Sequence, residues 1–427
     1  MLSSPPVFEA SPNVPGEGAQ QVMSRRRRWF YITVGLFISV WMAVLMTVAS
    51  TVIPDLYWFS YYSIDYGVGF VRRGLAGELV ELFPDDRYFT GLRVLRWLPT
   101  IAYGGALVAL AWVTATASGR SERRLMMAFL VPVLPFGFTF ALFSARPDLL
   151  GAAALIGFAL VLKRTGRARS VLIAGAAYGG ITAVLALAHE ATPLLFGLGA
   201  LSAIAVLGRR HSGKTLQLCA VLALAPALLA TVGVAVFGRR GVSESLCRSI
   251  PYGTVNWPAS GRPTVGQILR GFRFDVEYHD WICRNIVPLY DQSIADAARY
   301  VADIGPALLA AATAIGIALL AASVLAISQV SGVRFARMLT LLRARPLWVL
   351  VGLALFIPVF MTGVDWIRWW VTIALDIGVV FLLFANGEPE VDDPPTRRTR
   401  TTFALALALL ALFPLGILPG FGAAVPI

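Results

Sequence analysis

Long apolar runs alternate with short polar connections along nearly the whole chain. A helix that crosses a bilayer needs about 20 mostly apolar residues, and about eleven segments of this sequence approach that length. The predicted spans are residues 29–52, 97–117, 125–144, 148–163, 170–188, 191–208, 216–237, 304–327, 347–364, 369–386 and 402–424. The pattern therefore predicts an all-α fold, that of a polytopic integral membrane protein with about eleven transmembrane helices.

One pair of predicted spans is separated by a very short break. Residues 170–188 and 191–208 would together make a helix of about 39 residues, which is far too long for one crossing. Proline has no backbone N–H and clashes with the preceding turn of a helix. We therefore expect the chain to turn near Pro193.

The amino-acid composition supports a membrane protein. Hydrophobic residues make up 57% of the chain and charged residues 14%, whereas a soluble protein has about 25% charged residues. A soluble enzyme, a disordered chain and a secreted disulfide scaffold are therefore excluded. Residues 1–28 are expected to form a disordered, basic, cytoplasmic N-terminus, and residues 29–427 a single transmembrane domain.

The positive charges predict the orientation of the chain. The net charge is +12 and comes almost wholly from arginine. With the N-terminus in the cytoplasm, every inner connection has at least three positive residues, in agreement with the positive-inside rule. Two long loops, residues 53–96 and 238–303, then face outward. The Arg- and Ala-rich, Lys-poor composition is typical of a high-GC bacterium, so we expect a multi-pass protein of the inner (plasma) membrane.

The first outer loop combines aromatic side chains with one carboxylate and two adjacent arginines. Asp65 could act as a general base, and Arg72 and Arg73 are suited to bidentate phosphate binding. The alternative is a structural salt bridge in an interfacial segment. Charged groups in so aromatic a segment are costly unless they have partners or a function.

Two further outer connections also carry an arginine and an aspartate. Arg146 and Asp148 lie between the third and fourth spans, and Asp365 and Arg368 lie between the ninth and tenth. The arginines could bind an anionic ligand, with the aspartates in supporting roles. Alternatively, Asp148 is stabilised by the start of a helix, and Asp365 and Arg368 form an i,i+3 ion pair.

A His-Glu pair lies at the outer end of the fifth span. The chain has three histidines, and an ionisable pair at the membrane boundary indicates a functional site by default. His189 could carry a proton or bind phosphate, so His189 and Glu190 are candidate catalytic residues. The alternative is a structural pair that caps the break before Pro193.

The second long outer loop contains two cysteines. Cys247 and Cys283 are an even pair in a compartment that we expect to be oxidising, which predicts a disulfide. His279 lies among acidic residues in the same loop, but one histidine with two acids has no specific metal-ligand spacing. No metal site is therefore predicted.

About eleven spans, an acidic residue in the first outer loop and outer-face arginines resemble the C-type glycosyltransferase superfamily. The resemblance implies an enzyme that transfers a sugar from a polyprenyl-phosphate or polyprenyl-diphosphate donor to an envelope glycan or glycolipid on the outer leaflet. It also implies that Asp65 is the general base. The donor phosphate would be held by Arg72, Arg73, Arg146 or Arg368.

The chain also resembles O-antigen polymerases and ligases, which have a large periplasmic loop and outer arginines with a histidine. The loop 238–303 and His189 carry this second likeness. In both readings arginines neutralise the departing phosphate, and a carboxylate or histidine deprotonates the acceptor. The expected partners are a lipid-linked sugar donor, a glycan or glycolipid acceptor and membrane lipids. Neither nucleic acid nor a nucleotide cofactor is expected, and nothing in the sequence indicates a divalent cation.

Two alternatives that are not enzymes remain open. A transporter or lipid flippase needs polar residues along a path through the membrane, whereas Ala, Leu, Val, Ile and Gly dominate these spans. The apolar spans therefore favour a reaction at the outer face of the membrane over transport through it. A scaffold protein whose polar groups only pair with one another predicts that Asp65→Asn leaves function intact.

Overall fold

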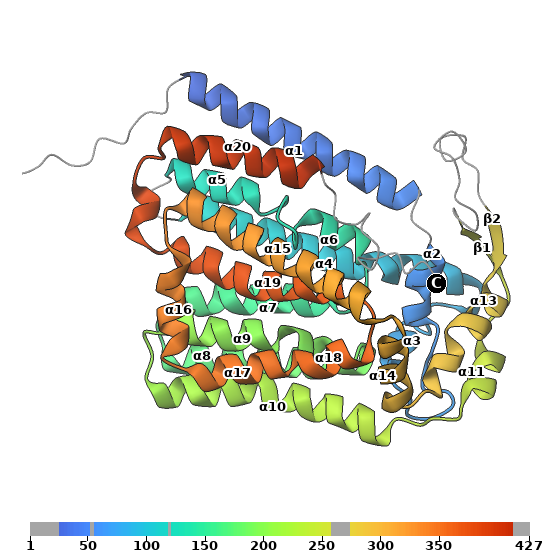
Figure 1. The fold of residues 1–427 in the computed structure, drawn as a ribbon. Coiled ribbons are helices and arrows are strands. Elements are labelled where there is room, and N and C mark those ends of the chain that lie inside the picture. Colours follow the sequence, from blue (N-terminus) through green and yellow to red (C-terminus); the bar gives the residue numbers. More distant parts are fainter. Residues whose placement is uncertain (1–24, 52–54, 118–120, 258–273, 413–427) are drawn as a thin grey trace, which may run out of the picture.

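The computed structural model describes residues 25–51, 55–117, 121–257 and 274–412. They form a bundle of long helices with a smaller cap of short helices and a two-stranded hairpin at one end (Figure 1). Residues 1–24, most of the segment predicted to be disordered, and the end of the eleventh predicted span lie outside the described residues.

The bundle is built from the segments that the apolar runs predict. Its helices are α1 (Arg25–Thr51), α4 (Tyr88–Thr116), α5 (Glu122–Leu130), α6 (Phe138–Phe143), α7 (Leu149–Arg164), α8 (Ala168–Ala188), α9 (Thr192–Leu207), α10 (Gly213–Phe237), α15 (Pro306–Ser331), α16 (Phe335–Arg343), α17 (Pro346–Ala354), α18 (Phe356–Thr362), α19 (Trp366–Ala385) and α20 (Arg397–Leu412). Six described helices are long and apolar enough to cross a membrane. Helix α16 and the segment formed by α17 and α18 are bent relative to each other, and if they together make one crossing the number rises to seven. The protein is a helical membrane protein, and eleven crossings stay a prediction.

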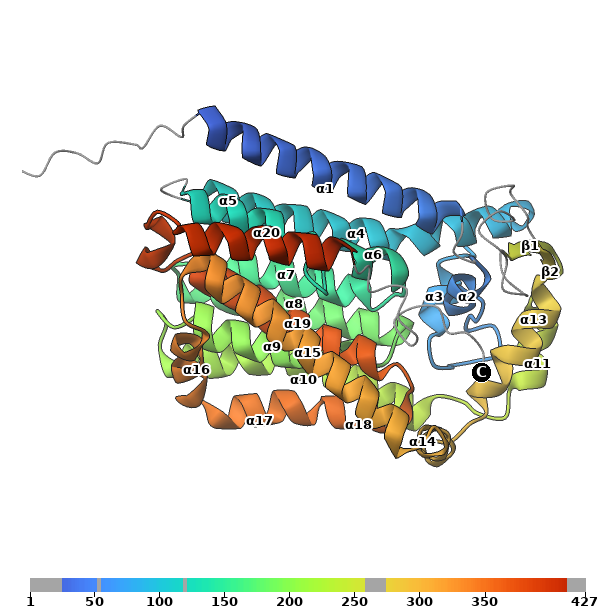
Figure 2. The ribbon, with the colours of Figure 1, turned by 45° about the horizontal axis from the view of Figure 1, so that its top comes forward.

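The cap gathers the segments that the sequence assigns to the two long outer loops (Figure 2). Its elements are α2 (Asp55–Phe59), η1 (Ser60–Tyr62), α3 (Gly74–Glu78), η2 (Asp85–Arg87), α11 (Ser243–Ser249), β1 (Thr254–Trp257), β2 (Phe274–Glu277), α13 (Tyr278–Asn285), η3 (Val287–Tyr290) and α14 (Ile294–Asp303). A core of its own holds most of these pieces together, and Trp58, Phe59 and Tyr278 are at most 1% exposed within it.

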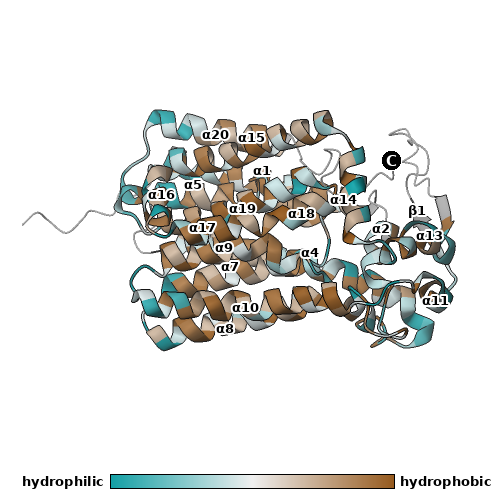
Figure 3. Ribbon diagram, turned by 60° about the horizontal axis from the view of Figure 1, so that its bottom comes forward, coloured by the Kyte–Doolittle hydropathy of each residue, from teal (hydrophilic) through white to brown (hydrophobic). Residues whose placement is uncertain are grey.

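Helix α19 lies inside the bundle, where it packs against α9 and α15. Along the most apolar stretch of α19, 89% of the residues are buried, whereas the corresponding share in α15 is 11%. Apolar side chains such as Ile181 on α8 and Leu229 on α10 are exposed, as expected for helices whose outer faces contact lipid. Figure 3 shows hydrophobic residues along the bundle and hydrophilic residues mainly at its two ends.

Proline positions explain where the predicted helices break. Helix α8 ends at Ala188 and α9 begins at Thr192, with Pro193 in the first turn. The predicted third span, residues 125–144, is in contrast not one helix: residues 131–137 form turns between α5 and α6. These turns contain Pro132 and Pro135, and each lacks the N–H that a continuing helix would need.

The first outer segment is shorter than the sequence predicts. Helix α4 begins at Tyr88 rather than at residue 97. The apolar pattern misses these first turns because they carry Arg93 and Arg96. The segment between α1 and α4 is therefore compact, and α2 packs directly against α4.

Charged residues at the end opposite the cap pair with one another. The Arg400 guanidinium contacts both Glu122 carboxylate oxygens at 2.8 and 2.9 Å, and Arg124 pairs with Asp392. These contacts join segments that the sequence assigns to cytoplasmic connections. They give the positive charges there a structural role.

Candidate functional site

Seven of the candidate residues form a network where the cap meets the bundle. They come from the start of α3, the α6–α7 connection, the α8–α9 turn and the start of α19. The residues are Arg73, Arg146, Asp148, His189, Glu190, Asp365 and Arg368. We call this set the polar network.

Arg73 and Glu190 form a bidentate ion pair. The Arg73 Nε and Nη2 atoms each lie 2.9 Å from a Glu190 carboxylate oxygen. Burial opposes ionisation of Glu190, but the Arg73 charge outweighs it and holds the pKa of Glu190 well below its usual range. Arg73 has φ 63°, the only positive φ of a described non-glycine residue. This conformation costs about 1–3 kcal/mol, so the surrounding contacts must hold it in place.

Two aspartate–arginine pairs connect α19 to the α6–α7 connection. Arg146 pairs with Asp365, and Arg368 pairs with Asp148 and also donates to the Ser144 hydroxyl. All four charged side chains are buried. Asp365 and Arg368 thus do not form the i,i+3 pair with each other. Each pairs with a residue of the α6–α7 connection.

Tyr61 stands between the charged groups. The guanidinium carbons of Arg73 and Arg146 lie 5.8 and 5.7 Å from its ring centroid, within the range of cation–π attraction. The His189 ring stacks on the same tyrosine at 5.9 Å. Tyr57 contacts Arg146 in the same way at 5.4 Å, and the Tyr57 and Tyr61 hydroxyls are 3.1 Å apart. The aromatic run thus orients the cations, a role beyond the interfacial anchoring that its composition predicts.

Several polar atoms of the network are buried without a hydrogen-bond partner among the described residues. They are Arg146 Nε and Nη2, Asp148 Oδ1, His189 Nδ1 and, beside them at the start of α9, Thr192 Oγ1. Buried polar atoms are nearly always satisfied by protein or water. The network therefore has unused capacity to bind a polar ligand or ordered water.

His189 is a neutral imidazole in this setting. Burial, and next the Arg73 charge, lower the pKa of His189 to about 4. The imidazole is therefore neutral near pH 7. Its Nδ1 atom is one of the buried atoms without a partner, so it can act as a hydrogen-bond acceptor in the tautomer protonated at Nε2.

Arg72 lies at the edge of the network and contacts the second long loop. Its guanidinium donates to the Leu289 carbonyl and lies 5.0 Å from the Tyr290 ring centroid. Arg72 takes part in none of the ion pairs of the described residues, and Arg240 is among the charges near it. Four arginines including Arg72 thus face three carboxylates, which leaves one positive charge when His189 is neutral.

Asp65 lies in a different, acidic group. Its Oδ1 accepts from the Gly67 amide at 2.7 Å. Burial and the neighbouring Asp65 carboxylate raise the pKa of Glu81, which places these two acids together. The described contacts join Asp65 to none of the arginines of the network. The predicted role of Asp65 as general base stays a prediction.

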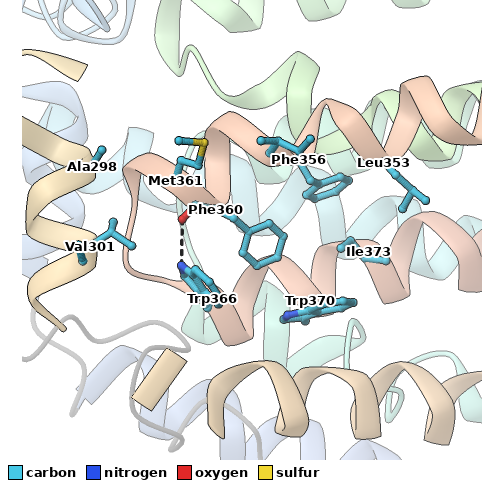
Figure 4. A pocket seen from close by; sticks show the side chains of 11 residues that line it. Ala298, Val301, Leu353, Phe356, Phe360, Met361, Trp366, Trp370 and Ile373 are labelled. Carbon is cyan, nitrogen blue, oxygen red and sulfur yellow. Dashed lines mark hydrogen bonds between the residues drawn. The ribbon is translucent and has the colours of Figure 1, made fainter. Parts of the chain in front are cut away.

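An apolar groove of about 490 Å³ lies between α14, α17, α18 and α19. Figure 4 shows Phe360, Trp366 and Trp370 among its lining, with the Trp366 indole donating to the Phe360 carbonyl at 3.1 Å. Trp366 directly follows Asp365 in sequence. The groove and the polar network therefore both use the start of α19, and the apolar lining of the groove is suited to a hydrocarbon chain.

Comparisons with known proteins place the chain in a family. Residues 31–411 match the family model described as "Uncharacterised membrane protein Rv1490". The chain belongs to this membrane protein family. It is 37% identical over 401 residues to "Uncharacterized protein Rv1490" of Mycobacterium tuberculosis (strain H37Rv) and, equally, to "Uncharacterized protein Mb1527" of Mycobacterium bovis. The alignments cover 93% of this chain and 92% of each relative, and no solved structure matches the chain.

The structure adds one buried acidic residue that the hydropathy pattern does not reveal. Asp376 lies inside α19 and is fully buried. One of its carboxylate oxygens accepts from the Gly199 amide at 3.0 Å, and the other has no partner among the described residues. A single aspartate in an apolar run does not disturb the hydropathy pattern, but a charged residue within a span is by itself a signal.

Proposed function

We propose that the protein transfers a sugar from a polyprenyl-phosphate or polyprenyl-diphosphate donor to an envelope glycan or glycolipid. In this proposal the cap end faces away from the cytoplasm, at the bacterial plasma membrane. The observation that carries the proposal is the set of buried, unpartnered polar atoms of Arg146, Asp148 and His189. A structural network would leave few such atoms unsatisfied, whereas a binding site must leave some available.

The positive charges support a phosphate-bearing donor. Arg72 has no ion-pair partner among the described residues, and its guanidinium can approach a phosphate in the bidentate way that arginine favours. Arg146 offers two further unpartnered nitrogens. The apolar groove beside Asp365 would take the hydrocarbon chain of the same donor.

The reaction then follows from the positions of these groups. The acceptor hydroxyl attacks the anomeric carbon, the bond from that carbon to the phosphate oxygen breaks, and the phosphate leaves with the electron pair. Arginine neutralises the charge that develops on it. The proton of the hydroxyl goes to a neutral base, and the candidate within the network is His189 Nδ1, a buried ring nitrogen without a partner among the described residues. Asp65 is the alternative base that the resemblance to C-type glycosyltransferases implies.

Deletion of the gene followed by mass spectrometry of the envelope glycans tests this function. The deletion strain should lack one sugar from a glycan or glycolipid. His189→Ala and Arg72→Ala should fail to restore it while still accumulating in the membrane, and the exposed Arg93→Ala should restore it. Asp65→Asn separates the two bases: restoration by this variant would leave His189 as the base. Full restoration by both His189→Ala and Arg72→Ala would refute the proposal.

A transporter or lipid flippase is the second candidate, and Asp376 favours it. Transporters need polar groups within the membrane, and Asp376 is a buried acid inside a spanning helix. Loss of a flippase would cause a complete lipid-linked sugar to accumulate on the cytoplasmic side. Loss of a transferase would instead leave the lipid-linked sugar on the outer side. Either loss removes the sugar from the glycan, so the side on which the lipid-linked sugar accumulates separates the two functions.

A further inference from the structure

A second apolar groove, of about 480 Å³, lies between α7 and α8. Several of the residues that line it are exposed, with Ile173 at 58% and Ile181 at 52%. Gly157 belongs to its α7 wall, and a Cβ added there would meet no atom within 4 Å. The groove is therefore open to the lipid that surrounds the bundle.

One end of the groove lies at a basic connection. On α7 the lining ends with Val161, and Arg164 follows three residues later. Residues three apart share one face of a helix, so Arg164 continues the face that lines the groove. On α8 the lining starts at Ser170, and Arg167 precedes it by three residues as the N-cap. The two arginines thus flank the same end of the groove.

These positive charges differ from the paired arginines at the same end of the bundle. Arg164 and Arg167 are exposed and take part in none of the ion pairs of the described residues. The His211 Nε2 atom lies 3.2 Å from the Thr165 carbonyl oxygen, which brings the α9–α10 connection alongside. That connection adds two more cations without an ion-pair partner in the described part of the chain, Arg210 and Lys214. The end of the groove therefore has an excess of positive charge.

The length of the groove matches one leaflet of a bilayer. At a rise of about 1.5 Å per residue, the α8 wall from Ser170 to Ile181 is about 16 Å long. The hydrocarbon core of a bilayer is about 30 Å thick, so one leaflet contributes about 15 Å. A hydrocarbon chain that starts beside Arg167 and follows the groove would therefore reach the middle of the membrane.

We propose that this groove binds one anionic phospholipid of the leaflet opposite the cap. One acyl chain lies between α7 and α8, and the phosphate lies between Arg164 and Arg167. The Arg167 side chain does not cap α8, so the phosphate also meets the unsatisfied amides and the positive dipole end of that helix. A zwitterionic lipid has a cation of its own beside the phosphate, and a soluble phosphate has no chain for the groove. Charge and groove together thus select an anionic lipid.

The proposal is independent of the proposed function. None of the residues that line the groove belongs to the polar network, and Arg164 lies at the opposite end of α7 from Asp148. The groove also lies outside the cap, where a disulfide joins Cys247 on α11 to Cys283 on α13. A lipid would occupy this site whether or not the protein transfers a sugar.

Native mass spectrometry of the full-length protein in detergent micelles tests the role of the charges. It compares phosphatidylglycerol, which is anionic, with phosphatidylcholine of the same acyl chains. The wild type should bind one phosphatidylglycerol about 30-fold more tightly, because each of two arginines near an anionic headgroup contributes about 1 kcal/mol and about 1.4 kcal/mol is tenfold. Arg164→Ala/Arg167→Ala should lose most of this preference. Arg334→Ala/Arg343→Ala, which removes two exposed arginines at the ends of α16, should keep it.

A groove-filling variant tests the acyl chain. Gly157→Phe would place a ring in the open space of the groove. It should weaken phosphatidylglycerol binding by about tenfold or more, the loss expected when two methylene groups of the chain are no longer buried. Gly105→Phe, at an equally open position on α4, should bind as the wild type does. Glycerol phosphate, a headgroup without chains, should not displace the lipid.

Three results would overturn the proposal. The first is equal binding of the two lipids by the wild type. The second is an unchanged preference in Arg164→Ala/Arg167→Ala, or an equal loss in Arg334→Ala/Arg343→Ala, because the preference would then follow net charge alone. The third is full binding by Gly157→Phe together with displacement by glycerol phosphate, which would indicate a site for free phosphate. If Gly157→Phe is not monodisperse, the two arginine variants decide.

Discussion

Removal of the Arg146 guanidinium should strongly destabilise the protein. The Arg146 and Asp365 side chains are 5% and 12% exposed, so Asp365 would be left as a buried carboxylate without its partner. Breaking a buried ion pair in this way costs about 3–5 kcal/mol. We expect Arg146→Leu to lower the free energy of unfolding by about 3 kcal/mol or more, roughly a hundredfold in the folded-to-unfolded ratio.

Replacement of both partners should restore most of that loss. An apolar pair of similar volume is often neutral or stabilising compared with a buried ion pair. The double variant Arg146→Leu/Asp365→Leu should therefore be more stable than Arg146→Leu by about 2 kcal/mol. Denaturant unfolding in detergent micelles, followed by tryptophan fluorescence, measures the difference. Arg248→Leu breaks an exposed pair with Glu244 and should change stability by less than about 1 kcal/mol.

The double variant also separates folding from function. It should accumulate as a folded protein and still fail to restore the envelope glycan, because it has lost the two unpartnered Arg146 nitrogens. If the changes in unfolding free energy of Arg146→Leu and Asp365→Leu simply add in the double variant, the two side chains are not energetically coupled, which would refute a stabilising role for the ion pair.

Three further predictions concern separate parts of the structure. Burial lowers the pKa of His189 from 6.5 to about 4, so the unfolded state binds more protons between these values. Stability should therefore fall as the pH drops from about 6.5 towards 4, and His189→Gln should flatten this part of the pH–stability curve; an unchanged curve would contradict the assigned burial. A Cβ at Gly77 would collide with the backbone of the preceding loop, whereas one at Gly180 has no atom within 4 Å. Immunoblots of membranes should show reduced accumulation of Gly77→Ala and normal accumulation of Gly180→Ala, and equal amounts would argue against the tight contact. Asp376→Asn keeps an acceptor for the Gly199 amide, so it should fold normally and restore the glycan; a folded but inactive variant would favour transport.

The sequence predicts the helices well where apolar runs are long and unbroken. It fails between α5 and α6, because hydropathy counts proline in an apolar run without regard to its missing N–H. It also places the start of α4 too late, because the first turns of that helix carry two arginines. Both errors concern the ends and continuity of helices and leave the class of fold unchanged.

The site is predictable only in part. Charged residues at separate connections share one end because the helices alternate in direction, so the sequence indicates the arginines and acids that meet there. It does not indicate which acid pairs with which arginine. The pairing of Arg146 with Asp365 depends on how α19 packs against its neighbours, and the contact of Tyr61 with two cations depends on the fold of the cap.

If the polar network binds the phosphate of a lipid-linked donor, the purified protein should bind a lipid phosphate. Native mass spectrometry in micelles can compare a polyprenyl phosphate with the neutral polyprenol of the same chain length. We expect the wild type and Arg93→Ala to bind the phosphate in preference to the alcohol, and Arg72→Ala and Arg146→Leu/Asp365→Leu to lose this preference. Equal binding of the two lipids by the wild type, or an undiminished preference in both network variants, would contradict it.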